Sequence, residues 1–388
     1  MITVINNAKV YDPQYLGYKT VVLVGKSIYK ILDNHRVEGW LQSHARVIDA
    51  SGMIAVPGFI DQHVHIIGGG GEGGPLTRIE EISLEEIVAN GITTVVGLLG
   101  ADNITRTMEE LYAKAKKLKM QGIDCYIYCG GYSRPFATIT GSLKKDIVFI
   151  DNIIGLGELA VSDYRSSQLR ESELLDLIAQ VYTASILSKK PGIVHVHVGP
   201  EKVGLKPLIE LVARFPKYLR HIIPTHINRS ADLLQEGMEF VRLGGMIDLT
   251  AGMWEDGGLS IGQSLSILKS RNIDLGSVSV SSDANGSMPV FDSRGQVLGT
   301  GVSRISALID EIKNINDQNI IGFEQCIGLI TQNPAKALGL SNIKGRIKEG
   351  YQGDIVIMDH ELHIHTVIAK GQVIFENGKL KNQNSMKK

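Results

Sequence analysis

The residues best suited to chemistry lie in one short stretch, residues 57–65, with the sequence PGFIDQHVH. An apolar run typical of a strand comes first, and two histidines follow it. Because alternate side chains of a strand share a face, His63 and His65 are expected to point the same way, with Val64 turned away. Two imidazoles so placed can hold one cation, and zinc, iron, nickel and copper suit such ligands. A pair of polar residues at a strand end is the simpler alternative.

Strand-length apolar runs recur along the chain, and segments typical of helices separate most of them. Hydrophobicity is continuous within these runs, as in parallel strands that are covered on both faces. One intervening helix is well marked, because Ser83 and Glu86 are spaced as a capping box and Gly91 supplies the stop. The eight runs are residues 53–60, 93–99, 124–129, 153–161, 193–198, 221–227, 246–250 and 278–282.

Eight such strands over roughly 290 residues fit a (β/α)8 barrel, and a doubly wound open sheet is the alternative. Residues 1–56 and 344–388 hold shorter β-rich runs, each too small for a core of its own. The predicted fold class is therefore α/β, a (β/α)8 TIM barrel with a small β-sandwich domain built from both termini. The barrel is expected over residues 57–343.

In such barrels the chemistry takes place at the C-terminal ends of the strands. Six residues of metal-ligating type fall at the ends of the first, fourth, fifth, sixth and eighth runs: His63, His65, Glu158, His197, His226 and Asp283. Chance placement of six at one end is hard to credit, and this ordering is stronger evidence than any single motif. The sequence therefore predicts a metal site at the C-terminal mouth of the barrel.

Composition excludes several other classes of protein. The chain of 388 residues has 40 Lys and Arg against 41 Asp and Glu, and no charge run stands out. Neither nucleic acid nor a membrane is therefore expected as a partner. There is no apolar stretch of about 18 residues that could span a bilayer, and no secretory signal is visible. The three cysteines match no disulfide framework, which favours a cytoplasmic location and buried thiols.

These motifs together resemble the amidohydrolase superfamily. Longer stretches narrow the resemblance: GGGGE at 68–72, GLLG at 97–100, SDYR at 162–165, PTHINR at 224–229 and SSDANGS at 281–287. They are similar to the isoaspartyl dipeptidases, a family of metallopeptidases that hydrolyse β-aspartyl dipeptides. The resemblance covers nearly the whole chain and implies a barrel joined to a β-sandwich from both termini. It also implies a homo-oligomer, such as an octamer.

The resemblance implies two divalent metal ions per chain, with zinc as the expected element. One would lie on His63, His65 and Asp283, and the other on the histidines of the fifth and sixth runs. Members of the family join the two metals with a carboxylated lysine, whereas the matching position here is Glu158. A glutamate already carries two oxygens that can bind metals. We therefore predict a centre whose assembly needs no bicarbonate.

Roles in hydrolysis follow from the same resemblance. A hydroxide shared by the metals would attack the scissile carbonyl, Asp283 would act as base and then as acid, and Tyr132 would stabilise the oxyanion. A β-aspartyl dipeptide carries one ammonium and two carboxylates, so its pocket needs an anionic side chain and arginines. The matching substrate-binding residues are Glu72 for the ammonium, Arg165 and Arg229 for the carboxylates, and Ser287 as a further polar contact.

Two alternatives stay open. One is another amidohydrolase, such as a cyclic-amide hydrolase or an N-acyl amino-acid deacylase. The second is a catalytically silent relative that serves as a scaffold, although such relatives usually lose ligands. Ala101 stands where the resemblance suggests a threonine, which leaves the fine substrate preference open. His195 lies two residues before His197 and is expected to support a ligand or to pack, and not to bind metal itself.

Overall fold

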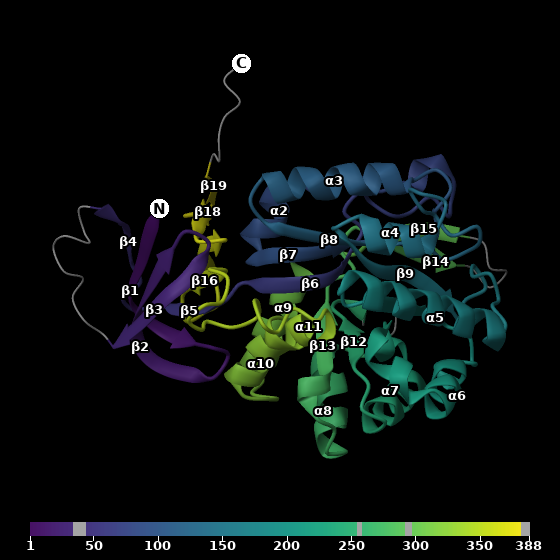
Figure 1. Ribbon diagram of the computed structural model, residues 1–388. Coiled ribbons are helices and arrows are strands. Elements are labelled where there is room, and N and C mark those ends of the chain that lie inside the picture. Colours follow the sequence, from purple (N-terminus) through teal and green to yellow (C-terminus); the bar gives the residue numbers. More distant parts are fainter. Residues whose placement is uncertain (34–43, 254–257, 292–296, 382–388) are drawn as a thin grey trace.

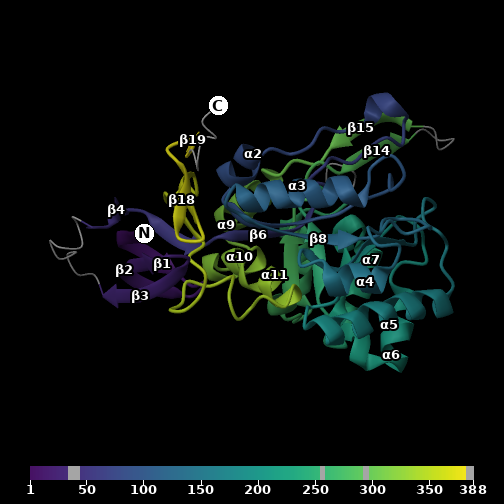
Figure 2. The ribbon, with the colours of Figure 1, turned by 45° about the horizontal axis from the view of Figure 1, so that its top comes forward.

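The computed structural model describes residues 1–33, 44–253, 258–291 and 297–381. The middle of the chain forms the larger body, and strands from the two ends lie together on one side of it (Figure 1). Figure 2 gives the same arrangement from a second direction, with the hairpin of β14 (Ser287–Phe291) and β15 (Val297–Val302) beyond helix α3 (Met108–Met120). No described helix is both long and apolar enough to cross a bilayer.

The larger body is an α/β barrel of the TIM type. Six parallel strands follow the order β11-β10-β9-β8-β7-β6, and β12 pairs in parallel with β13. An isolated parallel bridge between Val64 and Ala284 joins the first barrel strand to the segment after the last. The barrel strands are β6 (Phe59–Val64), β7 (Ile92–Gly97), β8 (Asp124–Cys129), β9 (Ile153–Val161), β10 (Ile193–Val198), β11 (Ile222–Thr225), β12 (Ile247–Thr250) and β13 (Val278–Ser281).

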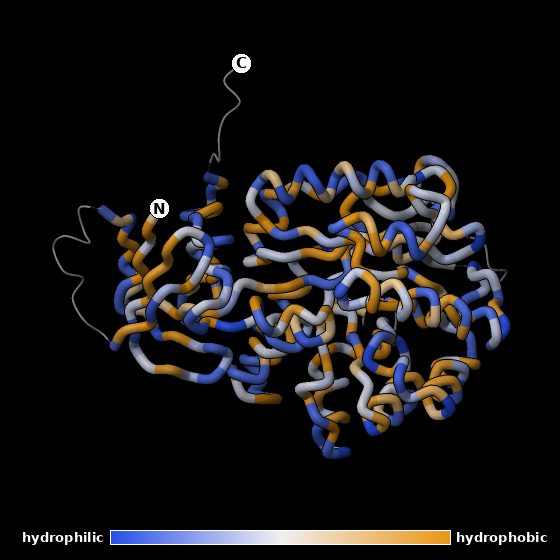
Figure 3. The backbone as a smooth tube through the Cα atoms, in the orientation of Figure 1, coloured by the Kyte–Doolittle hydropathy of each residue, from blue (hydrophilic) through white to orange (hydrophobic). Residues whose placement is uncertain are grey.

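Apart from the partly buried Tyr126 of β8, the residues of these strands are buried, which explains their continuous hydrophobicity. The orange segments of the tube in Figure 3 follow them through the interior. Helices follow the strands in sequence and cover the sheet. Besides α3 they are α2 (Leu84–Ala89), α4 (Leu143–Phe149), α5 (Glu171–Ser188), α6 (Lys206–Arg214), α7 (Ala231–Arg242), α8 (Ile261–Ser270), α9 (Ala307–Asp317), α10 (Phe323–Leu329) and α11 (Gln332–Ala337).

The capping box predicted for α2 is confirmed. The Ser83 hydroxyl accepts a hydrogen bond from the Glu86 amide, and the Glu86 carboxylate accepts one from the Ser83 amide. Gly91 follows the helix with a φ of 78°, a conformation that glycine adopts without strain. The two cysteines of β8, Cys125 and Cys129, are buried free thiols, as expected.

The prediction of one barrel strand over residues 53–60 is wrong. Strand β5 (Ile54–Pro57) pairs with β1 and β16 outside the barrel, and β6 starts only at Phe59. Gly58 stands between the two strands, where a Cβ atom would come within 2.3 Å of Thr93 Oγ1. An apolar run does not reveal that its two halves belong to different sheets.

Strands from both termini form one sheet in the order β19-β18-β17-β16-β5-β1-β2-β3, with β4 also paired to β1. This terminal sheet has a hydrophobic cluster of its own, which includes Ile5, Val21, Ile355 and Ile368. Apart from β5, its strands are β1 (Ile2–Tyr11), β2 (Tyr15–Val24), β3 (Ser27–Asp33), β4 (Arg46–Asp49), β16 (Ile355–Met358), β17 (Ile364–Ala369), β18 (Gln372–Glu376) and β19 (Lys379–Leu380).

A buried ion cluster ties the terminal sheet to the barrel. The Lys344 ammonium lies 2.7 Å from Asp124 of β8 and 2.6 Å from Asp354, which precedes β16. Lys370, after β17, adds a second contact to Asp124 at 2.7 Å. Burial alone would raise the pKa of Asp124, but the two lysines hold it far below its usual range. Burial would lower the pKa of Lys344, yet the two carboxylates raise it to about 12.

We predict that Lys344→Met destabilises the protein by about 3–5 kcal/mol at neutral pH, because it leaves two buried carboxylates without their shared cation. The depressed pKa of Asp124 gives a stabilisation that is present above its unfolded value, about 3.9, and is lost as the pH falls below that value. The difference in melting temperature between wild type and variant should therefore narrow below about pH 4. Thermal melts over a pH series measure it, with exposed Lys348→Met as control. Equal melting temperatures for Lys344→Met and wild type at neutral pH would contradict the prediction.

Candidate metal centre

The six predicted ligands meet at the C-terminal mouth of the barrel. Three lie in the last part of a strand, at His63 (β6), Glu158 (β9) and His197 (β10), and three come just after one, at His65 (β6), His226 (β11) and Asp283 (β13). Within the described residues, three groups of possible ligands have donor atoms within 4.8 Å of one another. The groups are His63 with His226 and Asp283, His63 with His65 and Glu158, and Glu158 with His197 and His226.

Glu158 stands at the middle of this cluster. Its Oε1 lies 2.8 Å from His197 Nδ1 and 3.1 Å from His226 Nε2. Its Oε2 lies 3.5 Å from His63 Nε2 and 3.7 Å from His65 Nε2. One carboxylate oxygen thus faces each pair of histidines, which is the arrangement that a carboxylate shared by two cations requires.

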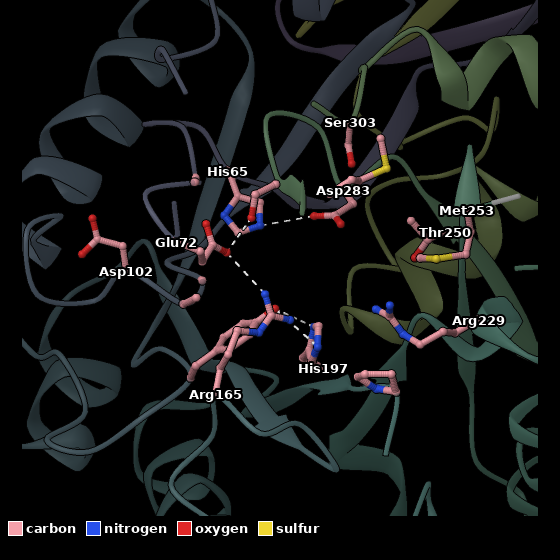
Figure 4. A pocket seen from close by; sticks show the side chains of 18 of the residues that line it. His65, Glu72, Asp102, Arg165, His197, Arg229, Thr250, Met253, Asp283 and Ser303 are labelled. Carbon is pink, nitrogen blue, oxygen red and sulfur yellow. Dashed lines mark hydrogen bonds and ion pairs between the residues drawn. The ribbon is translucent and has the colours of Figure 1, made fainter. Parts of the chain in front are cut away.

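Asp283 makes its shortest contacts in the cluster with the first pair of histidines. Its Oδ1 lies 3.2 Å from the Nε2 atoms of both His63 and His65. Figure 4 places His65 and Asp283 opposite one another across the upper part of the pocket, with His197 below them. The contacts at 3.2 Å fit the expected grouping of Asp283 with His63 and His65, although Asp283 also lies within 4.8 Å of His226.

Unpaired buried atoms test whether cations fit here. The atoms His63 Nε2, Glu158 Oε2 and Asp283 Oδ1 are buried and have no hydrogen-bond partner. Buried polar atoms without partners are rare and call for a bound group. Since imidazole nitrogens and carboxylate oxygens that converge in this way are typical ligands of divalent cations, the residues fit such ions.

The outward nitrogens of three histidines are occupied, which fixes the direction of each ring. His63 Nδ1 lies 2.9 Å from His195 Nε2, and His226 Nδ1 lies 2.8 Å from Thr250 Oγ1. His197 uses Nε2 in this role, at 3.0 Å from Asp163. Such outer contacts set the tautomer of a metal-binding histidine.

The backbone also turns sharply at two of the ligands. His226 has a φ of 63° and Asp283 a φ of 53°. Left-handed conformations are uncommon outside glycine, and residues held in them gather at functional sites. His226 directly follows β11 and Asp283 comes two residues after the end of β13, so each turn directs the side chain into the mouth of the barrel.

The charges in the cluster shift one another's pKa. Burial alone would raise the pKa of Glu158, but His63 and His197 hold it well below its usual range. Burial alone would lower the pKa of His63, whereas Glu158 and Asp283 raise it well above its usual value. Protons therefore compete with cations for this histidine, and cation binding is expected to weaken as the pH falls.

A pocket opens directly over the cluster, and charged side chains line it. Arg165 Nη1 lies 3.3 Å from Glu72 Oε1, and the Ser287 hydroxyl donates to the same oxygen at 2.6 Å. Arg229 lines another part of the pocket and donates through Nε to the Val198 carbonyl at 3.1 Å. In Figure 4 Glu72, Arg165 and Arg229 surround the space next to the histidines.

Tyr132 also lines the pocket and contacts the cluster. Its hydroxyl lies 2.7 Å from His197 Nδ1, and the Arg165 guanidinium lies over its ring at 5.2 Å from the centroid. Burial, with the nearby Glu158, raises the pKa of Tyr132 well above its usual value. The phenol therefore keeps its proton and remains a hydrogen-bond donor at neutral pH.

The structure brings all the predicted site residues to this one mouth of the barrel. Ala101 lies on the pocket wall as well, beside Asp102. His195 is fully buried and stacks on Tyr128, with ring centroids 5.2 Å apart, so it supports His63 from behind.

Sequence reasoning assigned no role to three residues that support the site. Asp163 accepts from His197, Thr250 contacts His226, and Asp61 accepts from the amides of His63 and Ser282. The sequence could have indicated two of these residues by their position, because Asp163 comes two residues after β9 and Thr250 is the last residue of β12. Both therefore lie at the same barrel mouth as the ligands.

Known proteins are similar to this chain in sequence and in fold. The model of the Amidohydrolase family matches residues 266–380. A solved structure of a beta-aspartyl dipeptidase from Fervidobacterium islandicum AW-1, in complex with beta-Asp-Leu dipeptide, is 38% identical with a TM-score of 0.92. That match covers 99% of this chain and 100% of the other. A dihydropyrimidinase from Brevibacillus agri shares the fold at 16% identity, with a TM-score of 0.69 over 98% of this chain and 96% of the other.

Among curated proteins, a dihydroorotase from Lactobacillus johnsonii is 29% identical over 54% of this chain and 48% of its own length. The matches to the dihydroorotases cover between 35% and 48% of those proteins' own length. The beta-aspartyl dipeptidase match, by contrast, covers both chains from end to end. The chain therefore belongs to the amidohydrolase family, and among its members it resembles the beta-aspartyl dipeptidases over its whole length.

Proposed function

We propose that the protein is a metal-dependent dipeptidase that hydrolyses the isopeptide bond of β-aspartyl dipeptides. One observation carries the proposal: Glu72, Arg165 and Arg229 line the pocket that three of the six expected ligands also line, His65, His197 and Asp283. A β-aspartyl dipeptide has one ammonium and two carboxylates, and this pocket offers one carboxylate and two guanidinium groups. The solved beta-aspartyl dipeptidase with its bound dipeptide supports the same assignment.

The histidines with Glu158 and Asp283 would hold two divalent cations, with zinc the expected element. Such a pair of cations polarises a carbonyl and lowers the pKa of water toward about 7. Asp283, whose Oδ1 faces His63 and His65, would take a proton from water and return it to the leaving amine. The Tyr132 hydroxyl would donate to the oxygen that gains negative charge.

Substrate binding falls to the side chains around the pocket. Glu72 would accept from the substrate ammonium, and Ser287 orients Glu72 through its hydrogen bond. Arg165 and Arg229 would bind the two carboxylates. Without substrate, Arg165 and Glu72 pair with each other at 3.3 Å. A zwitterionic substrate can replace this ion pair, because its ammonium can bind Glu72 and its carboxylate can bind Arg165.

Other proposals rest on the sequence. We infer that the terminal sheet, which has its own hydrophobic cluster, forms the small β-sandwich. For the domain limits we keep the expectation from the sequence, residues 56 and 343. A cytoplasmic location and a homo-oligomer, such as an octamer, belong to the same set of proposals.

The similarity to a dihydroorotase favours a second candidate, a cyclic-amide hydrolase. We predict that purified protein cleaves β-Asp-Leu and leaves α-Asp-Leu, dihydroorotate and N-acetyl amino acids intact. Amino-acid release and loss of each compound, followed by chromatography, decide between the candidates. Turnover of dihydroorotate with no cleavage of β-Asp-Leu would exclude the dipeptidase and favour the cyclic-amide hydrolase.

We predict that Asp283→Asn lowers kcat by about 10²–10⁴-fold, because an amide cannot carry the proton between water and amine. Metal content of the variant is measured in parallel, since Asp283 is also an expected ligand. Asp102→Asn is the matched control, because Asp102 lines the pocket but contacts Arg78 and Thr105 and none of the cluster. A metal-loaded Asp283→Asn variant with unchanged kcat would exclude the proton-transfer role.

We predict that protein stripped of metal by a chelator regains activity on addition of zinc alone, in buffer free of carbon dioxide. The reason is that Glu158 already supplies the two oxygens that a lysine must acquire by carboxylation. Metal should be lost more readily as the pH falls, since the raised pKa of His63 lets protons displace cations. Recovery that requires bicarbonate would contradict the role given to Glu158.

A further inference from the structure

Asp163 is a fully buried carboxylate that links two parts of the site. Its Oδ2 accepts from His197 Nε2 at 3.0 Å and from Arg165 Nη2 at 2.7 Å. Its Oδ1 accepts from the Arg165 amide at 2.8 Å and from Arg165 Nε at 3.0 Å. One side chain therefore contacts both an expected metal ligand and an expected substrate-binding residue.

The contact with His197 leaves only one ring nitrogen for the metal centre. Because an ionised carboxylate only accepts hydrogen bonds, Nε2 must carry the ring proton. Nδ1 then keeps its lone pair, and it lies 2.8 Å from Glu158 Oε1 on the side of the other ligands. Asp163 thus sets both the tautomer and the direction of this imidazole.

The contact with Arg165 restricts the guanidinium in the same way. Nε and Nη2 are bound along one edge by the two oxygens of Asp163. The Nη1 group remains on the pocket side, where it lies 3.3 Å from Glu72. The arginine therefore presents a defined edge to an incoming carboxylate, at little loss of side-chain entropy on binding.

Packing prevents Asp163 from moving away from this position. Gly199, at the end of β10, approaches so closely that a Cβ atom there would lie 2.5 Å from the Asp163 Cβ. The Gln168 amide also donates to the Asp163 carbonyl at 2.8 Å. Asp163 is thus held in place by contacts to both its backbone and its side chain.

We propose that Asp163 is a positioning residue that couples the two halves of the site, holding the His197 ring for metal and the Arg165 guanidinium for a substrate carboxylate. The arginine half of this inference rests on the proposed function. The histidine half rests only on the metal centre, so the two are tested separately.

The first test measures zinc affinity by competition with a chelator, without substrate. Asp163→Asn keeps the size of the side chain but replaces one acceptor oxygen with an NH₂ donor, so it can no longer accept all four hydrogen bonds from His197 and Arg165. The affinity of the site that includes His197 for zinc should fall about 10–100-fold. Asp146→Asn is the matched control, because Asp146 is equally buried and accepts from Ile139 and Thr140 away from the centre. Wild-type zinc affinity in Asp163→Asn overturns the metal half.

The second test measures KM for β-Asp-Leu in a double-mutant cycle. Both Asp163→Asn and Arg165→Gln should raise KM, but zinc affinity should change by no more than about twofold in Arg165→Gln, which leaves the Asp163–His197 contact in place. In the double variant KM should match that of Arg165→Gln, because both changes act through one guanidinium, whereas the loss of zinc affinity should persist. Independent, multiplying effects on KM overturn the arginine half.

Melting of the metal-free proteins checks that each variant folds. If Asp163→Asn does not fold, the smaller Asp163→Ser is measured in the same two tests, with the same outcomes expected. If the wild-type protein cleaves no β-aspartyl dipeptide, the proposed function fails, and the zinc measurement still decides whether Asp163 positions His197.

Discussion

The electrostatic balance at the barrel mouth governs the rest of the structure. Two carboxylates, the buried Glu158 and the partly buried Asp283, face four imidazoles with no other partner for some of their atoms. Burying a charged group is unfavourable unless it is paired and hydrogen-bonded. The cluster is therefore stable only with bound protons or bound cations, and the orientation of its atoms favours cations. The surrounding residues keep the ligands in this arrangement.

The barrel makes such a cluster possible, because its parallel strands bring residues that are distant in sequence to one edge. The side chains behind the ligands then remove the remaining freedom. His195, Asp163 and Thr250 each bind the outer nitrogen of one histidine. At the opposite end of β8, the ion cluster of Asp124 and Lys344 fixes the barrel to the terminal sheet. At both ends of the barrel, buried charges are thus stabilised by partners of opposite charge.

Much of this site could be predicted from sequence, because the ligands lie at strand ends and barrel topology fixes which ends meet. His63, Glu158 and Asp283 are examples. The contacts between side chains could not be predicted. Nothing in the sequence pairs Asp163 with His197, since that contact depends on the turn after β9 and on the close approach of β10. The division of residues 53–60 between two sheets was missed for a similar reason, because local hydrophobicity does not specify the partner strand.

We expect Glu158 to lie between two cations held by the histidines and Asp283. Anomalous diffraction from a crystal of the zinc-loaded protein would locate these cations. We predict two zinc peaks per chain, one beside His63, His65 and Asp283 and one beside His197 and His226, with a Glu158 oxygen on each. Zinc bound elsewhere in the chain, or at this mouth without contact to Glu158, would contradict it.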